Sequence, residues 1–245
     1  MNVAEAGLEL RERAVLEMRT VLGRVTPLRN AYRRWINWHR DEDLRLFHDV
    51  LSAGPLAGKW RVFGGVILGV ERSGKLIEWD RDIDVVVLRE DFPALVRTIS
   101  DLKECGFRLK ENFVGSDGTI IGVHLRRHSF QFDFFVGDLV AHEDAPTRSD
   151  LNLFELQFRE LVMIDGTVFE QTGRIPYSEV DHIGVVGRSW PCSSDRPAEL
   201  ALMYGPTWRV PDRSWKGSAS PYAVNVAPYK GLLGTWTPLE GFLNA

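Results

Sequence analysis

The segment Trp79-Asp-Arg-Asp-Ile-Asp84 carries three aspartates whose spacing could bind a divalent cation. Asp82 and Asp84 lie two residues apart, directly before the apolar run Val85–Leu88. Side chains two residues apart point to the same face of a strand, with their Cα atoms roughly 6–7 Å apart. Hard cations prefer carboxylate oxygens, whereas two close carboxylates without a cation repel each other. The pair therefore predicts a metal site in preference to a solvated strand end, while Asp80 fits either interpretation equally well.

Asp133 lies in the middle of a second apolar, β-prone run. Burying an aspartate there is costly unless another group pairs with it. A metal ion shared with Asp82 and Asp84 from a neighbouring strand would supply that partner, and an ion pair with Arg126 or Arg127 is the alternative. We therefore predict that Asp82, Asp84 and Asp133 are catalytic metal ligands. Mg²⁺ and Mn²⁺ both accept carboxylate oxygens, so the sequence does not choose between them.

A glycine pair, Gly64-Gly65, lies between a short β-prone segment and a helical one. Such a turn lets backbone N–H groups approach an anion, and the following helix N-terminus favours negative charge. A Gly-Gly turn alone is usually only a turn. It becomes evidence for an anion-binding site because it lies just before the aspartates in the sequence. Arg72 and Lys75 lie between the two motifs and could neutralise phosphate charge, or they could belong to an ordinary exposed loop. The pattern predicts metal-assisted attack on a nucleoside-phosphate donor.

Three aromatic residues are candidates for substrate contacts. Trp79 borders the aspartates and could stack on a base or sugar, or simply wall the site. Tyr204 and Trp208 lie in a Gly/Pro-containing segment and predict a lid or an acceptor wall, with plain packing as the alternative. The scattered histidines are better explained by structural roles than by metal binding: His124, His128 and His182.

The elements that must position these residues follow from hydrophobic periodicity and from helix and turn signals. We predict helices at 5–22, 29–39, 41–51 (capped by Asp41), 66–70, 91–104 (with Pro93 in its first turn) and 197–204. We predict strands at 60–63, 83–88, 107–113, 119–126 and 130–136. Residues 152–162 fit a helix or a strand, residues from Asp138 onward read as loop, and the last 35 or so residues should wrap the surface. This order favours an α+β fold, a small mixed sheet flanked by helices, over a doubly wound sheet.

Bulk composition narrows the class of protein. Of 245 residues, 44% are hydrophobic, which is enough for a core without disulfides. The net charge of −4 argues against a nucleic-acid binder. Cys105 and Cys192 have no metal-binding or redox spacing and predict reduced thiols. No secretory signal or membrane-spanning run is visible, so we expect a cytoplasmic protein that could still act beside a membrane.

These residues resemble the LicD and fukutin-related family of the nucleotidyltransferase fold. The family pattern is roughly Gly-Thr-Leu-Leu-Gly-x-x-Arg, a loop, and Ile-Pro-Trp-Asp-Asp-Asp-Ile-Asp. This chain has Gly-Gly-Val-Ile-Leu-Gly-Val-Glu-Arg at 64–72 and Ile-Glu-Trp-Asp-Arg-Asp-Ile-Asp at 77–84. The similarity extends to Arg89-Glu-Asp-Phe92, Gln131-Phe-Asp-Phe-Phe135 and Tyr204-Gly-Pro-Thr-Trp208 with Pro211. It covers roughly residues 42–212. We therefore expect an N-terminal helical extension at 1–41, a catalytic domain at 42–212 and an irregular tail at 213–245.

The resemblance implies a transferase that moves a phosphorylated small group, such as phosphocholine or ribitol phosphate, from a CDP-linked donor to a glycan or lipid-linked glycan. It implies Asp82, Asp84 and Asp133 as metal ligands, with Gly64, Gly65 and Arg72 at the donor phosphates. Three departures leave the metal pair intact but put donor specificity in question. Val66 replaces a Thr, Glu78 a Pro and Arg81 the middle Asp of the pattern.

Two other functions remain open from the sequence. A nucleotidyltransferase that adds NMP to a small molecule or protein would use the same carboxylates, but would release pyrophosphate. A non-catalytic nucleotide- or partner-binding module would keep the fold without turnover, although three intact aspartates argue against it. The sequence predicts neither the oligomeric state nor the role of the N-terminal helices.

Overall fold

The computed structural model describes residues 26–141, 154–164, 167–212 and 222–230. The chain divides into two compact units, Met1–Glu42 and Asp43–Ala245. The predicted helix at 5–22 lies outside the described residues. The predicted division at 41/42 and 212/213 stays a prediction.

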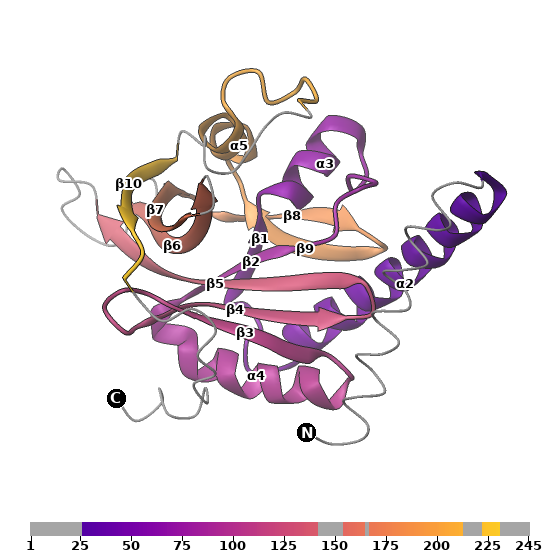
Figure 1. Cartoon of the computed structure of the whole chain (residues 1–245), viewed down its shortest axis with the longest axis horizontal. Coiled ribbons are helices and arrows are strands. Elements are labelled where there is room, and N and C mark those ends of the chain that lie inside the picture. The colour runs from indigo at the N-terminus through magenta and orange to yellow at the C-terminus, as the bar shows by residue number, and fades with distance from the viewer. Residues whose placement is uncertain (1–25, 142–153, 165–166, 213–221, 231–245) are drawn as a thin grey trace. The chain divides into compact units, whose positions relative to one another are not determined.

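The second unit is an α+β structure built on a mixed sheet of eight strands (Figure 1). The main path runs β1-β2-β5-β6-β7-β10, and β4 joins β5 with β3 at its outer side. The pairing of β2 with β5 is parallel, and the other pairings among the described strands are antiparallel. A separate hairpin pairs β8 with β9. The bounds of the strands are β1 Trp60–Phe63, β2 Asp84–Leu88, β3 Arg108–Val114, β4 Ile120–Arg127, β5 Phe130–Ala141, β6 Phe154–Ile164, β7 Thr167–Tyr177, β8 Val180–Val185, β9 Arg188–Ser193 and β10 Ala223–Pro228.

Helices lie on both faces of this sheet. In Figure 1, α4 lies below β3–β5, and α3 and α5 lie on the opposite side. Local signals set their ends, as expected from glycine and proline chemistry. Gly74, at φ 68°, ends α3, Pro93 lies in the first turn of α4, and Asp195 caps α5 by accepting from the Ala198 amide at 3.2 Å. The helix bounds are α2 Thr26–Ala53, α3 Gly65–Ser73, α4 Phe92–Glu104 and α5 Arg196–Tyr204, with a 3₁₀ turn, η1, at Arg89–Asp91.

The predicted break at Asp41 is wrong, because α2 is one continuous helix through Ala53. No glycine or proline interrupts residues 28–53, so helical hydrogen bonding continues where an N-cap was expected. Asp41 instead accepts a hydrogen bond from Arg40 at 3.1 Å.

The strands predicted at 60–63, 83–88, 107–113, 119–126 and 130–136 are confirmed within one or two residues at most ends, as are the helices at 91–104 and 197–204. The helix predicted at 66–70 runs longer, over Gly65–Ser73. The loop predicted from Asp138 is wrong at its start, because β5 continues to Ala141. Residues 154–164 form a strand, the second of the two alternatives. Three further features were not predicted: β7, the β8–β9 hairpin, and β10 within the segment expected to be an irregular tail.

The core between sheet and helices contains a cluster of aromatic side chains. Phe47 of α2 packs on Phe132 and Phe134 of β5, with ring centroids 4.6 and 5.5 Å away, and on Trp190 of β9 at 6.4 Å. Because residues alternate along a strand, this places Phe132 and Phe134 on one face of β5 and Asp133 on the other. The packing therefore directs Asp133 away from the aromatic core.

Candidate active site

The turn between β1 and α3 packs directly on two carboxylates. Gly64 has φ 67° and ψ −129°, a conformation that favours glycine. A Cβ at Gly64 would lie 3.1 Å from Asp84 Oδ2, and one at Gly65 would lie 2.6 Å from Asp80 Oδ2. The glycine pair therefore lets the backbone approach the acidic segment more closely than residues with side chains could.

Asp84 and Asp133 are direct register partners on the parallel strands β2 and β5. The pairing continues before β2, where the Ile83 amide donates to the Gln131 carbonyl at 3.1 Å and the Asp133 amide donates to the Ile83 carbonyl at 2.9 Å. Neighbouring strands are about 4.8 Å apart, so the two carboxylates emerge side by side on one face. The predicted convergence of these two aspartates from adjacent strands is what the register shows.

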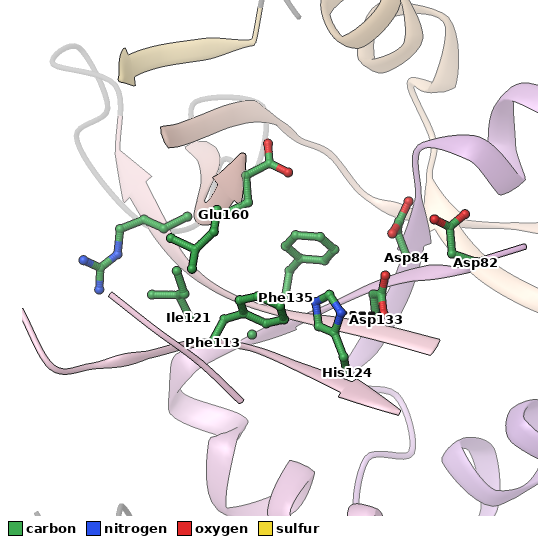
Figure 2. A pocket seen from close by; sticks show the side chains of 11 residues that line it. Asp82, Asp84, Phe113, Ile121, His124, Asp133, Phe135 and Glu160 are labelled. Carbon is green, nitrogen blue, oxygen red and sulfur yellow. Dashed lines mark ion pairs between the residues drawn. The ribbon is translucent and has the colours of Figure 1, made fainter. Parts of the chain in front are cut away.

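A cavity of about 230 Å³ opens above this face. Figure 2 shows Asp82, Asp84 and Asp133 gathered at one end and Glu160 at the other, with aromatic side chains between them. The lining residues outside the acidic end are Phe113, Ile121, Gly122, His124, Phe135, Arg159, Glu160 and Leu161.

Burial and mutual repulsion make the ionised forms of these carboxyls costly. Burial, reinforced by Asp82 and Asp133, raises the pKa of Asp84 well above its usual range. Burial raises the pKa of Asp133 to about 7, against a hydrogen bond from Gln131 that lowers it. Burial and Asp82 raise the pKa of Asp80 to about 8. Carboxyls concentrated in this way favour a positively charged ligand.

Asp133 has neutral neighbours in place of the predicted arginine alternative. Gln131 Nε2 donates to Asp133 Oδ2 at 2.8 Å, and His124 Nδ1 lies 3.2 Å from Asp133 Oδ1 (Figure 2). Burial lowers the pKa of His124 to about 4, so its ring is neutral at pH 7. Arg127 pairs with Asp43 instead. Asp133 Oδ1 is buried, and none of the described residues donates a hydrogen bond to it, so its ionised form is costly.

These residues suit a divalent cation chemically, although no three His, Cys, Asp or Glu side chains in the described ranges already have the geometry of a metal site. The donor set is made of carboxylate oxygens, which Mg²⁺ and Mn²⁺ prefer. The buried Asp133 Oδ1 lies 3.2 Å from the neutral His124 ring and accepts no hydrogen bond from the described residues. Carboxylates that repel each other separate when no cation lies between them. The three aspartates therefore fit the predicted ion.

The two predicted phosphate-binding cations lie in different surroundings. The Arg72 guanidinium donates to the Trp208 carbonyl, and its Nη2 donates to the Val210 carbonyl at 3.3 Å. Arg72 thus connects the end of α3 to the segment after α5 through these hydrogen bonds. Lys75 is exposed in the loop after α3.

Of the three aromatic residues predicted to contact substrate, two lie near the aspartates and one is buried in the core. Trp79 is 64% exposed beside the aspartates, where a substrate could stack on it. Trp208 is only 3% exposed and belongs to the hydrophobic core, with Arg209 above its ring at 4.1 Å. Burial and the neighbouring Asp84 raise the pKa of Tyr204 well above its usual range, and a Cβ at Gly64 would lie 3.5 Å from its hydroxyl. Tyr204 therefore lies at the acidic end of the cavity, whereas Trp208 packs in the hydrophobic core.

A second group of polar residues at the cavity was not predicted. The Tyr222 hydroxyl donates to Glu160 Oε1, and Gln171 Nε2 donates to the same oxygen at 2.5 Å. Burial raises the pKa of Glu160, and Glu160 in turn contributes to the raised pKa of Asp84. The alternation of buried and half-buried residues along β6 is the sequence signal that could have placed Glu160 on this face.

Comparison with known proteins agrees with the resemblance drawn from the motifs. Residues 60–182 match the family model described as LicD/FKTN/FKRP, nucleotidyltransferase domain, which covers half of the 245-residue chain. The chain belongs to the LicD family. A search of the curated proteins found no match.

The matched range of the LicD family model runs from β1 into β8. It contains the glycine turn, the aspartate segment, Asp133 and Glu160, whereas Tyr204, Trp208 and Tyr222 lie beyond it. Membership supports an enzyme of the transferase class. None of the helices in the described residues is long and apolar enough to cross a membrane.

Proposed function

We propose that this LicD-family protein transfers a phosphorylated small group, of the phosphocholine or alditol phosphate type, from a CDP-activated donor to a glycan acceptor, with a divalent metal ion as cofactor. The observation that supports this most directly is the in-register placement of Asp84 and Asp133, with Asp82, at one end of an acidic cavity. Family membership supplies the reaction class.

Asp82, Asp84 and Asp133 would hold Mg²⁺ or Mn²⁺. A divalent ion bound there would polarise the transferred phosphoryl group and offset its charge. Tyr204 and Gln131 keep the carboxylates oriented from either side, since Gln131 donates to Asp133 and the Tyr204 hydroxyl lies against the Gly64 turn beside Asp84. Trp79 offers an exposed ring for the base or sugar of the donor.

We propose Glu160 as the base that accepts the proton of the attacking hydroxyl. It lines the cavity away from the proposed metal ligands, and Tyr222 and Gln171 both hold its Oε1. The acceptor oxygen forms a bond to the transferred phosphorus, the phosphoanhydride bond breaks, and CMP leaves with the bridging oxygen. The acceptor's proton passes to the Glu160 carboxylate and from there to water.

A ligand panel with product analysis tests this function. Wild type and Asp84→Asn would be compared by thermal shift with CDP-choline, CDP-ribitol, CDP-glycerol and ATP, each with and without Mn²⁺. Asp101→Asn, an exposed aspartate on α4, is the matched control. A saturating ligand raises stability by RT ln(1 + [L]/Kd), about 2.7 kcal/mol at a hundred times Kd. We expect a metal-dependent shift with a CDP compound in wild type and in the control, and none in Asp84→Asn.

The product then separates the candidate reactions. Release of CMP with a phosphodiester-linked acceptor supports the proposal. Pyrophosphate with a nucleotidylated acceptor would replace it with NMP transfer. Failure of every compound to bind at millimolar concentration would contradict both enzymatic functions.

A further inference from the structure

The strand register arranges polar residues in two rows on the cavity face of the sheet. Residues directly opposite one another across neighbouring strands form each row. The first row contains Asp84, Asp133, His124 and Glu111. The second row contains Gln131, Arg126 and Arg108.

The second row points to the same side as the acidic cavity. His124 lines the cavity, and Arg126 follows it by two residues on β4, so the two side chains share a face. The Gln131 amide confirms this direction for its row. Its Nε2 donates to Asp133 Oδ2 at 2.8 Å and lies 3.2 Å from His124 Nδ1.

Arg108 and Arg126 are directly opposite each other on β3 and β4. Two like charges in this arrangement destabilise an antiparallel pair unless an anion lies between or above them. Arg108 already has another interaction within the chain, so Arg126 is the arginine of the pair that we consider for anion binding. Arg126 is half-buried, and its guanidinium makes no hydrogen bond or ion pair with another residue in the described ranges.

Two other arginines among the described residues already bind groups within the chain. Arg159 lines the cavity, but its guanidinium binds Glu170 at 3.0 Å and Asp117 at 3.1 Å. Arg72 donates to two backbone carbonyls beyond α5. A diphosphate carries more negative charge than one divalent ion at the aspartates would neutralise, so a further cation is needed nearby.

We propose that Arg126, beside Arg108, binds a phosphate group of the donor next to the acidic end of the cavity. This rests on the proposed function and replaces the expectation that Arg72 and Lys75 supply the phosphate charge. The row of Arg126 is about 6.6 Å from that of Asp133, and β4 is about 10 Å from β2, within the reach of a long side chain. A guanidinium can bind phosphate through two parallel hydrogen bonds, which fixes its orientation.

Calorimetric titration of the full-length protein tests this subsite with CDP and with pyrophosphate, each in the presence of Mn²⁺. Arg126→Gln should weaken both ligands by roughly tenfold to a hundredfold. Arg126→Lys should recover part of the loss, because it restores the charge without the paired hydrogen bonds. Arg97→Gln, an exposed arginine on α4, should bind as wild type does. Mn²⁺ affinity, followed by electron paramagnetic resonance, should be unchanged in all three variants.

Equal binding of pyrophosphate by wild type and Arg126→Gln would overturn the subsite, as would failure of wild type to bind pyrophosphate with Mn²⁺. Failure of the proposed function gives a different result. If pyrophosphate binding depends on Arg126 but no CDP-linked compound turns over, the subsite stands and the CDP donor is wrong.

Discussion

Two places in the molecule hold aspartates away from solvent, and they do so in opposite ways. Asp43 of α2 is completely buried and pairs with Arg127 and His128, the latter at 2.9 Å, at the β4–β5 hairpin. Asp84 and Asp133 lie beside each other on β2 and β5, and no Lys or Arg in the described residues forms an ion pair with either of them. One carboxylate is satisfied by the chain itself, whereas the others repel each other.

The comparison distinguishes a structural aspartate from a candidate metal ligand by the partners of the carboxylate and not by its burial. A buried charge that is paired fixes two elements together, and removing one partner leaves the other unpaired. Buried like charges raise each other's pKa and reduce stability unless something from outside joins them. The acidic end of the cavity therefore stores a cost that a bound cation would relieve.

The largest effect should come from Asp84→Asn. We expect turnover with the proposed donor to fall by roughly a thousandfold or more, because a metal ligand that stabilises transition-state charge is lost. The free energy of unfolding of the metal-free protein should rise, since the substitution removes a carboxyl whose ionised form is disfavoured by desolvation, Asp82 and Asp133. Turnover assays and urea titrations in EDTA measure the two effects. A less stable metal-free variant would contradict the comparison.

Asp43→Asn should have the opposite effect on stability. The Arg127 guanidinium would lose its buried partner, and breaking such a pair costs about 3–5 kcal/mol. Urea denaturation measures this loss. Mn²⁺ binding by the fraction that remains folded should be retained, because Asp43 is not in the cavity lining. If Asp43→Asn lowered the free energy of unfolding by less than about 1 kcal/mol, Asp43 would not differ from Asp84 and Asp133 in the way proposed.

Glu199 of α5 should make the stability of the protein depend on pH. It is 2% exposed, and burial raises its pKa to about 7 in spite of the nearby Arg61 and a backbone hydrogen bond from Gly64. The folded pKa is above the unfolded value of 4.5, so its stabilising contribution is complete below pH 4.5 and is lost as the pH rises through about 7.

Glu199→Gln does not titrate and should remove this part of the pH dependence. Between pH 5 and pH 8, the free energy of unfolding should fall by about 1–3 kcal/mol more in wild type than in the variant, at about 1.4 kcal/mol per pKa unit. Urea titrations across this range measure the difference. If the free energy of unfolding changed equally with pH in wild type and Glu199→Gln, the folded protein would not hold Glu199 in its protonated form.

The smallest effect should come from Asp49→Ala, at an ion pair near the protein surface. Asp49 accepts from Arg188 Nε at 2.6 Å and Nη2 at 2.7 Å, and these hydrogen bonds lower the pKa of Asp49 to about 2. Both partners are solvated, so the pair contributes little at physiological salt. The urea midpoint should hardly move. A shift as large as that of Asp43→Asn would show that pairing matters regardless of burial.

The acidic end of the site was predictable because its signal is local. Asp82 and Asp84 share a face through their spacing alone, and Asp133 was conspicuous in an apolar strand. The direct alignment of Asp84 with Asp133 required the β2–β5 register, which depends on how the intervening elements fold. Arg127 looked like a partner for Asp133 by proximity in sequence, but it lies on the other face of β4 and reaches α2.

Contacts between distant segments account for what the sequence did not predict. The Gly64 turn was found correctly, yet the Gly64 amide hydrogen bonds to Glu199, far along the chain. Glu160, Gln171 and Tyr222 come together only because β6, β7 and the start of β10 are adjacent. Gly173 and Pro176 within β7 obscure its strand pattern, since both residues are unfavourable in strands.

The parallel pairing of β2 with β5 also sets the order in which the molecule can acquire its function. Parallel strands need a crossover, and here α4, β3 and β4 lie between the two aspartates along the chain. A folding intermediate that lacks this crossover cannot bring Asp84 to Asp133. An ion shared by Asp84 and Asp133, as we propose, would therefore bind only after this crossover has brought β2 and β5 together.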